Sequence, residues 1–250
     1  MYWSRGLLKQ NAKQVLRESY WRVFLAWLLI SLGVGAAASI LSYIIVFVPT
    51  ILLSFAAVVS PESYIAGAII LYSVLLVFML AFNALATQPV SIGGIRYTME
   101  NRAGYPPLDS VLSPFRDKVQ YLNVAKVMFF YTLEIMAFSL LFVIPGIVRS
   151  YQLRYVPYLL AENPYMDYKR AKELSKALTD GEKMEIFVLD LSFIGWYLLG
   201  YLTCGLGIYF LIPYVQATMA ELYAAARAKA FAMGITGEEE LAGFAAYPRR

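Results

Sequence analysis

The sequence predicts an all-α membrane protein with six transmembrane helices arranged as three helical hairpins. Of the 250 residues, 60% are hydrophobic and only 15% are charged, whereas soluble domains carry about 25% charged residues. The apolar residues form long continuous runs instead of alternating with polar ones, which favours helices over a β-barrel. Because lipid cannot satisfy free backbone N–H and C=O groups, helices are the spanning element that remains.

An amphipathic helix is expected at the start of the chain, over residues 4–19. Its apolar face comprises Leu7, Leu8, Ala12, Val15 and Leu16, and its basic residues are Arg5, Lys9, Lys13 and Arg17. Such a helix suits the lipid headgroups, but it also suits a solvated helix that leads into the first span. The sequence leaves both interpretations open.

Six apolar segments are interpreted as membrane spans. They cover about residues 21–46, 64–87, 121–143, 147–160, 186–203 and 208–226. Residues 49–59 are too short for another crossing, so they extend the first helix, re-enter the membrane or lie in its interface. A cytoplasmic helix is expected at 163–183, between the fourth and fifth spans, with Gly181 as its C-cap. Residues 1–230 thus form a single transmembrane domain, and 231–250 form a polar C-terminal tail.

Basic residues set the expected orientation of these spans. With six spans, 17 of the 21 Lys and Arg residues fall on one side of the membrane, whereas the turns VSPES (59–63) and CGLG (204–207) carry none. The positive-inside rule therefore places both termini in the cytoplasm. We expect a multi-pass protein of the bacterial cytoplasmic (inner) membrane, with membrane lipids among its partners.

Charged residues also occur inside the predicted spans. A charge at the bilayer centre costs about 2.5–3.5 kcal/mol on insertion scales, so such groups should face protein or water. Folding the third and fourth spans about Pro145 and Gly146 brings Glu134 and Arg154 to similar depth. We predict that these two residues pair, with Arg149 nearer the outer headgroups. The predicted ligand-binding set is Glu134, Arg149, Arg154, Asp190, Tyr151 and Tyr155.

Three interpretations of this set remain open. The ion pair locks two adjacent helices together, or a partly hydrated cavity binds an anionic group with Arg149 and Arg154 as its cationic side. In the third interpretation the fourth span is not embedded in the membrane. Tyr151, Tyr155 and Tyr158, spaced four and three residues apart, share one face of the predicted helix and either line the cavity or form an interfacial aromatic belt.

Several kinds of chemistry are excluded or unsupported. The chain has no histidine and one cysteine, which excludes histidine-based metal sites and histidine-dependent nucleophilic triads. It has no metalloprotease or phosphate-loop motif. We therefore expect no enzymatic activity, no cofactor and no metal. The basic residues lack the aromatic interleaving of a nucleic-acid site, so no nucleic-acid partner is expected.

Three stretches of the chain resemble one family. They are LLKQNAKQVLRESYWRVFLAWLL (7–29), IPGIVRSYQLRYVPYLLAENP (144–164) and the segment 175–223, which begins SKALTDGEK and ends QATMAELY. Together they resemble the bacterial integral-membrane family catalogued as domain of unknown function 975. That family is distantly similar to the membrane domain of some glycerophosphodiester phosphodiesterases. The resemblance implies a six-helix cytoplasmic-membrane protein, and it implies neither phosphodiesterase activity nor any catalytic residue.

Two functions of different classes fit these features. In the first, the protein binds or transports a small or anionic ligand through a polar intramembrane cavity lined by the predicted set. In the second, it is a non-catalytic membrane scaffold, stress or immunity component that acts through protein partners or as a homo-oligomer. The small-residue segment SLGVGAAAS (31–39) favours close helix packing and so supports the second function.

Overall fold

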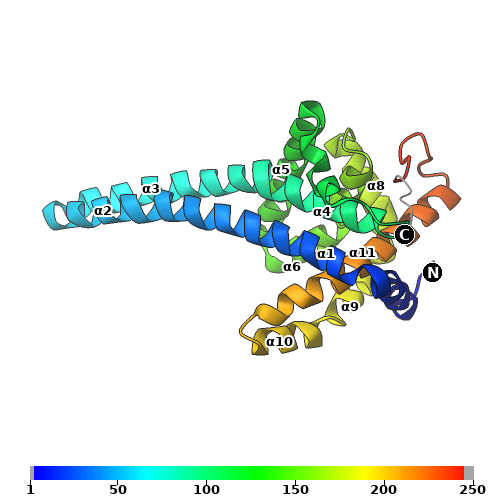
Figure 1. Cartoon of the computed structure of the whole chain (residues 1–250). Coiled ribbons are helices and arrows are strands. Elements are labelled where there is room, and N and C mark those ends of the chain that lie inside the picture. The colour runs from blue at the N-terminus through cyan, green and yellow to red at the C-terminus, as the bar shows by residue number, and fades with distance from the viewer. Residues whose placement is uncertain (1–2, 245–250) are drawn as a thin grey trace.

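The computed structural model describes residues 3–244, which form helices and turns without a β-strand (Figure 1). The first half contains α1 (Arg5–Ser42), the π-helix η1 (Tyr43–Phe47), α2 (Val48–Val59), α3 (Pro61–Phe82), the π-helix η2 (Asn83–Thr87), α4 (Gln88–Glu100) and the 3-10 helix η3 (Leu108–Phe115). The second half contains α5 (Lys118–Leu141), α6 (Val143–Gln152), α7 (Val156–Glu162), α8 (Tyr168–Thr179), α9 (Lys183–Leu191), α10 (Ile194–Leu202) and α11 (Leu206–Ala232). The predicted all-α class is confirmed.

The first hairpin projects from the body of the protein as a two-helix rod (Figure 1). One arm runs without interruption through α1, η1 and α2, and after Ser60 the other runs through α3, η2 and α4. Residues 49–59 therefore extend the first helix, which was one of the alternatives. Each π-helical segment begins six residues before a proline, Pro49 or Pro89. Because proline cannot donate to the carbonyl four residues earlier and crowds it, the turn before it widens to π geometry.

The apolar face at the start of α1 packs on the protein, while the basic residues Arg5, Lys13 and Arg17 stay exposed. Ser4 caps the helix by accepting the N–H of Leu7. On the apolar face Leu8, Ala12 and Leu16 are buried, and α1 packs against α11. Neither of the two alternatives anticipated this burial. α1 continues directly into the first predicted span.

Close contacts hold the other arm of the first hairpin on the body. A Cβ atom on Gly93 of α4 would lie 1.8 Å from the carbonyl oxygen of Val111 in η3, so only glycine fits there. Trp27 of α1 donates its indole N–H to the Thr98 hydroxyl of α4 at 3.0 Å. These contacts fix the base of the rod between α1 and η3.

The second hairpin, α5 and α6, has one short arm. α6 has 10 residues, which rise about 15 Å, or half of a hydrocarbon core of about 30 Å. The chain then turns over residues 153–155, and α7 is buried inside the body. The segment predicted as a fourth span, 147–160, thus forms two short helices. Pro157 in the first turn of α7 explains the break, because it has no N–H to donate to the carbonyl of Leu153.

The third hairpin consists of α9, α10 and α11. Its first arm, predicted as the span 186–203, is interrupted by a turn at Ser192 and Phe193. At its tip Gly205 has a positive φ of 83°, where glycine carries no steric penalty. A Cβ atom on Gly207 would lie 2.9 Å from the Cα atom of Gly200, so these two glycines allow α10 and α11 to meet closely.

The predicted cytoplasmic helix is present as α8. Gly181 follows its end with a φ of 73°, as expected for a C-cap. The described part of the segment predicted as a polar tail packs on the body: Leu241 is fully buried, and Arg170 of α8 holds the Glu240 carboxylate with two hydrogen bonds of 2.7 Å. The buried Glu162 carboxylate also joins this segment to α7 and α11, because it accepts hydrogen bonds from the side chains of Tyr223 and Arg227 and from the backbone N–H of residue 243.

Within the described residues, four helices are long and apolar enough to cross a membrane. They are Arg5–Phe55, Tyr64–Glu100, Lys118–Leu141 and Lys183–Leu202. The tips of the second and third hairpins are strongly apolar and exposed, with Leu140 at 78% and Leu202 at 81%. Apolar surfaces of this extent are typical of proteins that sit in a membrane. This supports the predicted membrane class, whereas the six-span arrangement is not confirmed.

Candidate functional site

The first polar cluster surrounds the Glu134 carboxylate of α5, and we call it the Glu134 cluster. Arg149 of α6 donates to Glu134, and so do the Tyr168 hydroxyl and, at 2.8 Å, the Lys172 ammonium group, both of α8. Arg149 also donates to the Gln152 side chain at 2.5 Å. The side chains of Arg149 and Glu134 are only 9% and 15% exposed. Three helices thus meet on one largely buried carboxylate.

The second polar cluster surrounds Asp190 of α9, and we call it the Asp190 cluster. Arg154, in the turn between α6 and α7, donates to Asp190 at 3.0 Å. The Tyr151 hydroxyl of α6 donates to the other carboxylate oxygen at 2.9 Å. The guanidinium group of Arg154 also lies 3.3 Å from the sulfur of Met219 in α11. This cluster therefore ties the end of α6 to the third hairpin.

These contacts correct the predicted pairing. The prediction joined Glu134 to Arg154, but the structure joins Glu134 to Arg149 and Lys172, and Arg154 to Asp190. The reason is the break at residues 153–155, which separates Arg154 from the helix that carries Arg149. The prediction had treated both arginines as members of one straight helix.

Tyr155 takes part in neither ion-pair cluster. It is 1% exposed, and its ring packs against those of Tyr158 and Tyr223 with centroids 6.5 and 6.1 Å away. Its backbone N–H donates to the Ser175 hydroxyl of α8 at 3.1 Å. The helix break separates Tyr151 from the predicted tyrosine face, whereas Tyr155 and Tyr158 remain in contact. Tyr155 belongs to the core of the body.

A polar pocket of about 360 Å³ lies beside the Glu134 cluster, and we call it the Gln152 pocket. It is lined by Gln152, Lys176, Ala177, Asp180 and Lys183. That α8 forms a wall of this pocket was not predicted from the sequence. The four-residue spacing of Tyr168, Lys172 and Lys176 nevertheless indicates that they share one face of a helix. Residues four apart lie on one face of a helix, and the first two members of this row contact Glu134.

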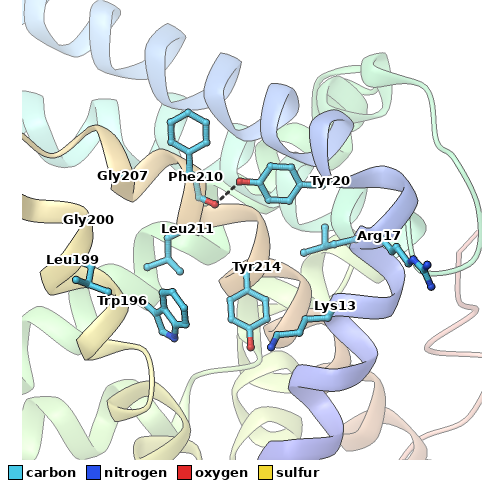
Figure 2. A pocket seen from close by; sticks show the side chains of 11 residues that line it. Lys13, Arg17, Tyr20, Trp196, Leu199, Gly200, Gly207, Phe210, Leu211 and Tyr214 are labelled. Carbon is cyan, nitrogen blue, oxygen red and sulfur yellow. Dashed lines mark hydrogen bonds between the residues drawn. The ribbon is translucent and has the colours of Figure 1, made fainter. Parts of the chain in front are cut away.

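A larger groove of about 680 Å³ lies between α1 and the third hairpin (Figure 2). We call it the α1–α11 groove. Lys13 and Arg17 of α1 line one part of it, and Trp196, Leu199, Phe210 and Leu211 provide much of its apolar wall. The Tyr20 hydroxyl donates to the backbone carbonyl of Phe210 at 2.7 Å and so fixes α1 against α11. No residue of the predicted ligand-binding set lines this groove.

Both ion-pair clusters act chemically as ties between helices. Each carboxylate accepts hydrogen bonds from at least one cation and one tyrosine hydroxyl. In the Glu134 cluster, whose ion pair is largely buried, removing one member leaves an uncompensated charge, which is strongly unfavourable. The part of the chain that the structure describes contains no group of three or more acidic or cysteine side chains arranged to hold a metal ion.

Comparison with known families gives one match. Residues 116–230 match the family described as "Protein of unknown function (DUF975)". The match supports the resemblance seen in the sequence, and it covers α5 to α11 apart from the end of α11. No curated protein and no solved structure matches the chain.

Proposed function

We propose that the protein binds a small anionic ligand at the junction of α6, α8 and α9. The second half of the chain matches a family of unknown function. The observation that carries this proposal is an imbalance of charge. Arg149 and Lys172 share the single carboxylate of Glu134, and Lys176 lies one turn further along the same face of α8. The Gln152 pocket opens beside these cations, on what the basic residues suggest is the cytoplasmic side.

The electrostatics of α8 support an anion site. Burial and the positive charge of Arg149 lower the pKa of Lys172. Burial, Arg149 and Lys172 together lower the pKa of Lys176, against the opposing effect of Glu173. The other acid at the pocket, Asp180, bonds to Lys183 at 3.3 Å. The like charges therefore crowd one another, and a bound anion relieves that repulsion.

Inorganic phosphate is a direct probe of this site. The full chain in detergent is titrated with phosphate and binding is measured by calorimetry. We expect saturable binding that weakens about tenfold in Lys176→Gln, since one charge-assisted contact is lost. Lys169→Gln is the matched control, because Lys169 is an exposed lysine on the same helix. Equal binding by the two variants, or no saturable binding by the wild type, would refute the proposal.

The topology that we propose has three hairpins entering the bacterial cytoplasmic membrane from the inside, with both termini cytoplasmic. The first hairpin is long enough to cross twice. In the six-span form, α6–α7 and α9–α10 each cross the membrane as a span that is interrupted by a turn. The shortness of α6 and α10 instead favours shallower insertion of the second and third hairpins. In this setting the pocket opens to the cytoplasm instead of into a channel.

The second candidate function is a non-catalytic scaffold, stress or immunity component. The first hairpin favours it, because Gly33 and Gly35 have no atom within 4 Å of a Cβ placed on them. The flank of the rod is therefore open to another helix, from a second copy or from a membrane partner. Gly33→Leu should weaken self-association or partner binding, measured by cross-linking in membranes, and should leave phosphate binding unchanged.

A further inference from the structure

We propose that the α1–α11 groove holds one anionic phospholipid. Its headgroup phosphate lies against Lys13 and Arg17, and an acyl chain lies along the apolar wall formed by α10 and α11. This site is separate from the Gln152 pocket and does not depend on the function proposed above.

Among the described residues, neither cation of the groove forms an ion pair with a carboxylate. Lys13 and Arg17 are exposed and lie one turn apart on α1. Lys13 points toward the ring of Tyr214, 5.7 Å from its centroid, whereas Arg17 points away from Lys13 (Figure 2). The Arg17 side chain is exposed, so in the proposed complex it turns back toward the headgroup. Glu18, the acid next along the helix, accepts a hydrogen bond from Tyr105 at 2.8 Å. A phosphate group is the anion that every membrane surface supplies to such a pair.

The charge along this helix extends beyond the two residues in the groove. Arg5 and Lys9 continue the row at the same four-residue spacing. Burial and the charges of Lys13 and Arg5 lower the pKa of Lys9. The positive charges along this row therefore repel one another. Each Lys or Arg close to an anionic bilayer contributes about 1 kcal/mol of attraction.

The apolar wall suits an acyl chain. Trp196, Leu199 and Phe210 are 55%, 57% and 50% exposed. The volume of about 680 Å³ lies within the range of about 300–1,000 Å³ found for ligand sites. The groove is therefore large and apolar enough for one lipid chain.

The aromatic residues indicate that the groove lies at the membrane surface. Tyr20, Trp196 and Tyr214 border it, and tyrosine and tryptophan are enriched at headgroup level. The tip of the third hairpin, beyond Trp196, is apolar and exposed. The groove thus combines a cationic end at the headgroups with an apolar end directed into hydrocarbon. This polarity matches a phospholipid better than a water-soluble anion or a second copy of the chain.

Fluorescence quenching tests the proposal directly. The full chain is placed in vesicles that contain phosphatidylglycerol or phosphatidylcholine with brominated acyl chains, and quenching of Trp196 is taken as the difference between wild type and Trp196→Phe. We expect phosphatidylglycerol to quench Trp196 at lower mole fraction than phosphatidylcholine. Lys13→Gln should lower this preference about fivefold, and the double variant with Arg17→Gln about 25-fold.

Controls separate recognition of the headgroup from loss of charge or of folding. The matched double variant Lys118→Gln/Lys169→Gln removes two exposed lysines elsewhere and should keep the preference. Lys13→Arg should also keep it, because the charge remains. Phosphate binding at the Gln152 pocket should be unchanged in the Lys13 and Arg17 variants, so the two proposals fail independently.

Three results would overturn the proposal. The first is equal quenching of wild-type Trp196 by the two lipids. The second is an undiminished preference in the Lys13→Gln/Arg17→Gln variant. The third is quenching that falls as the protein-to-lipid ratio rises, together with cross-links between two copies of the chain at the groove. A second copy of the chain, not a lipid, would then occupy the groove.

Discussion

Glu134→Gln is the perturbation that tests the buried polar architecture most directly. Glu134 is the only carboxylate that contacts Arg149 among the described residues. The glutamine side chain has nearly the same shape and still accepts a hydrogen bond from Tyr168, but it removes the negative charge. The change therefore isolates the electrostatic part of the contact.

The expected loss of stability follows from burial. Breaking a buried ion pair by removing one partner costs about 3–5 kcal/mol. Lys172 is 29% exposed on its side chain and can turn toward water, whereas Arg149 at 9% cannot. With one acceptor retained, we expect a cost at the low end, about 3 kcal/mol. For a chain of this size that lowers the apparent Tm by about 6–12 °C.

A double-mutant cycle in detergent, read by thermal unfolding, distinguishes the observed pairing from the predicted one. Glu134→Gln and Arg149→Gln should couple by about 1–3 kcal/mol, because the second change removes the charge that the first leaves unpaired. Glu134→Gln and Arg154→Gln share no partner and should add within about 0.5 kcal/mol. Coupling of Glu134 to Arg154, together with additivity toward Arg149, would refute the geometry of both clusters.

Three further predictions follow from other parts of the fold. Gly93→Ala should cost about 3 kcal/mol or more through its clash with the η3 backbone, whereas Gly33→Ala, inside α1 and with open space around it, should leave the Tm unchanged or raise it slightly. The hydrogen bond from Arg170 lowers the pKa of Glu240 below its ordinary 4.5, so its stabilisation of the C-terminal segment is present above that value and lost as pH falls through the lowered pKa. Hydrogen exchange of residues 234–244 should accelerate over that acidic range, and Glu240→Gln should abolish the change. A membrane-impermeant maleimide added outside intact cells should leave Cys204 unlabelled if the third hairpin is shallow, and labelling of Cys204 would support the six-span form.

Local signals in the sequence located most helices well. The predicted span 121–143 corresponds to α5, and the glycine expected after the cytoplasmic helix is Gly181, with the left-handed φ of a C-cap. The turn before the second span is at Ser60. These features depend on hydropathy, capping and turn residues within a few positions of one another, which a sequence carries directly.

The misplaced features depend on contacts between distant segments. The sequence indicated that Arg149 and Arg154 need counter-charges, but not which carboxylates supply them. Asp190 lies 36 positions from Arg154. The break at 153–155, which directs Arg154 toward Asp190, is reinforced by a hydrogen bond from the backbone N–H of Tyr155, within the turn, to the Ser175 hydroxyl of α8. Hydropathy alone does not reveal such a break, because the residues around it are apolar whether lipid or protein covers them.

The contact of α1 with the third hairpin bears on how deeply that hairpin enters the membrane. The Lys9 ammonium group donates to the backbone carbonyl of Ser192 at 3.4 Å and lies 4.4 Å from the centroid of the Phe193 ring. A lysine in this basic row is most stable at the cytoplasmic headgroups, so in the proposed topology we expect Ser192 at that level too. Only α10 and the tip then remain to enter hydrocarbon, and its nine residues rise about 14 Å, which is half of the core thickness. The same depth puts the α1–α11 groove at the headgroups, so shielding of Cys204 and lipid preference at Trp196 should occur together.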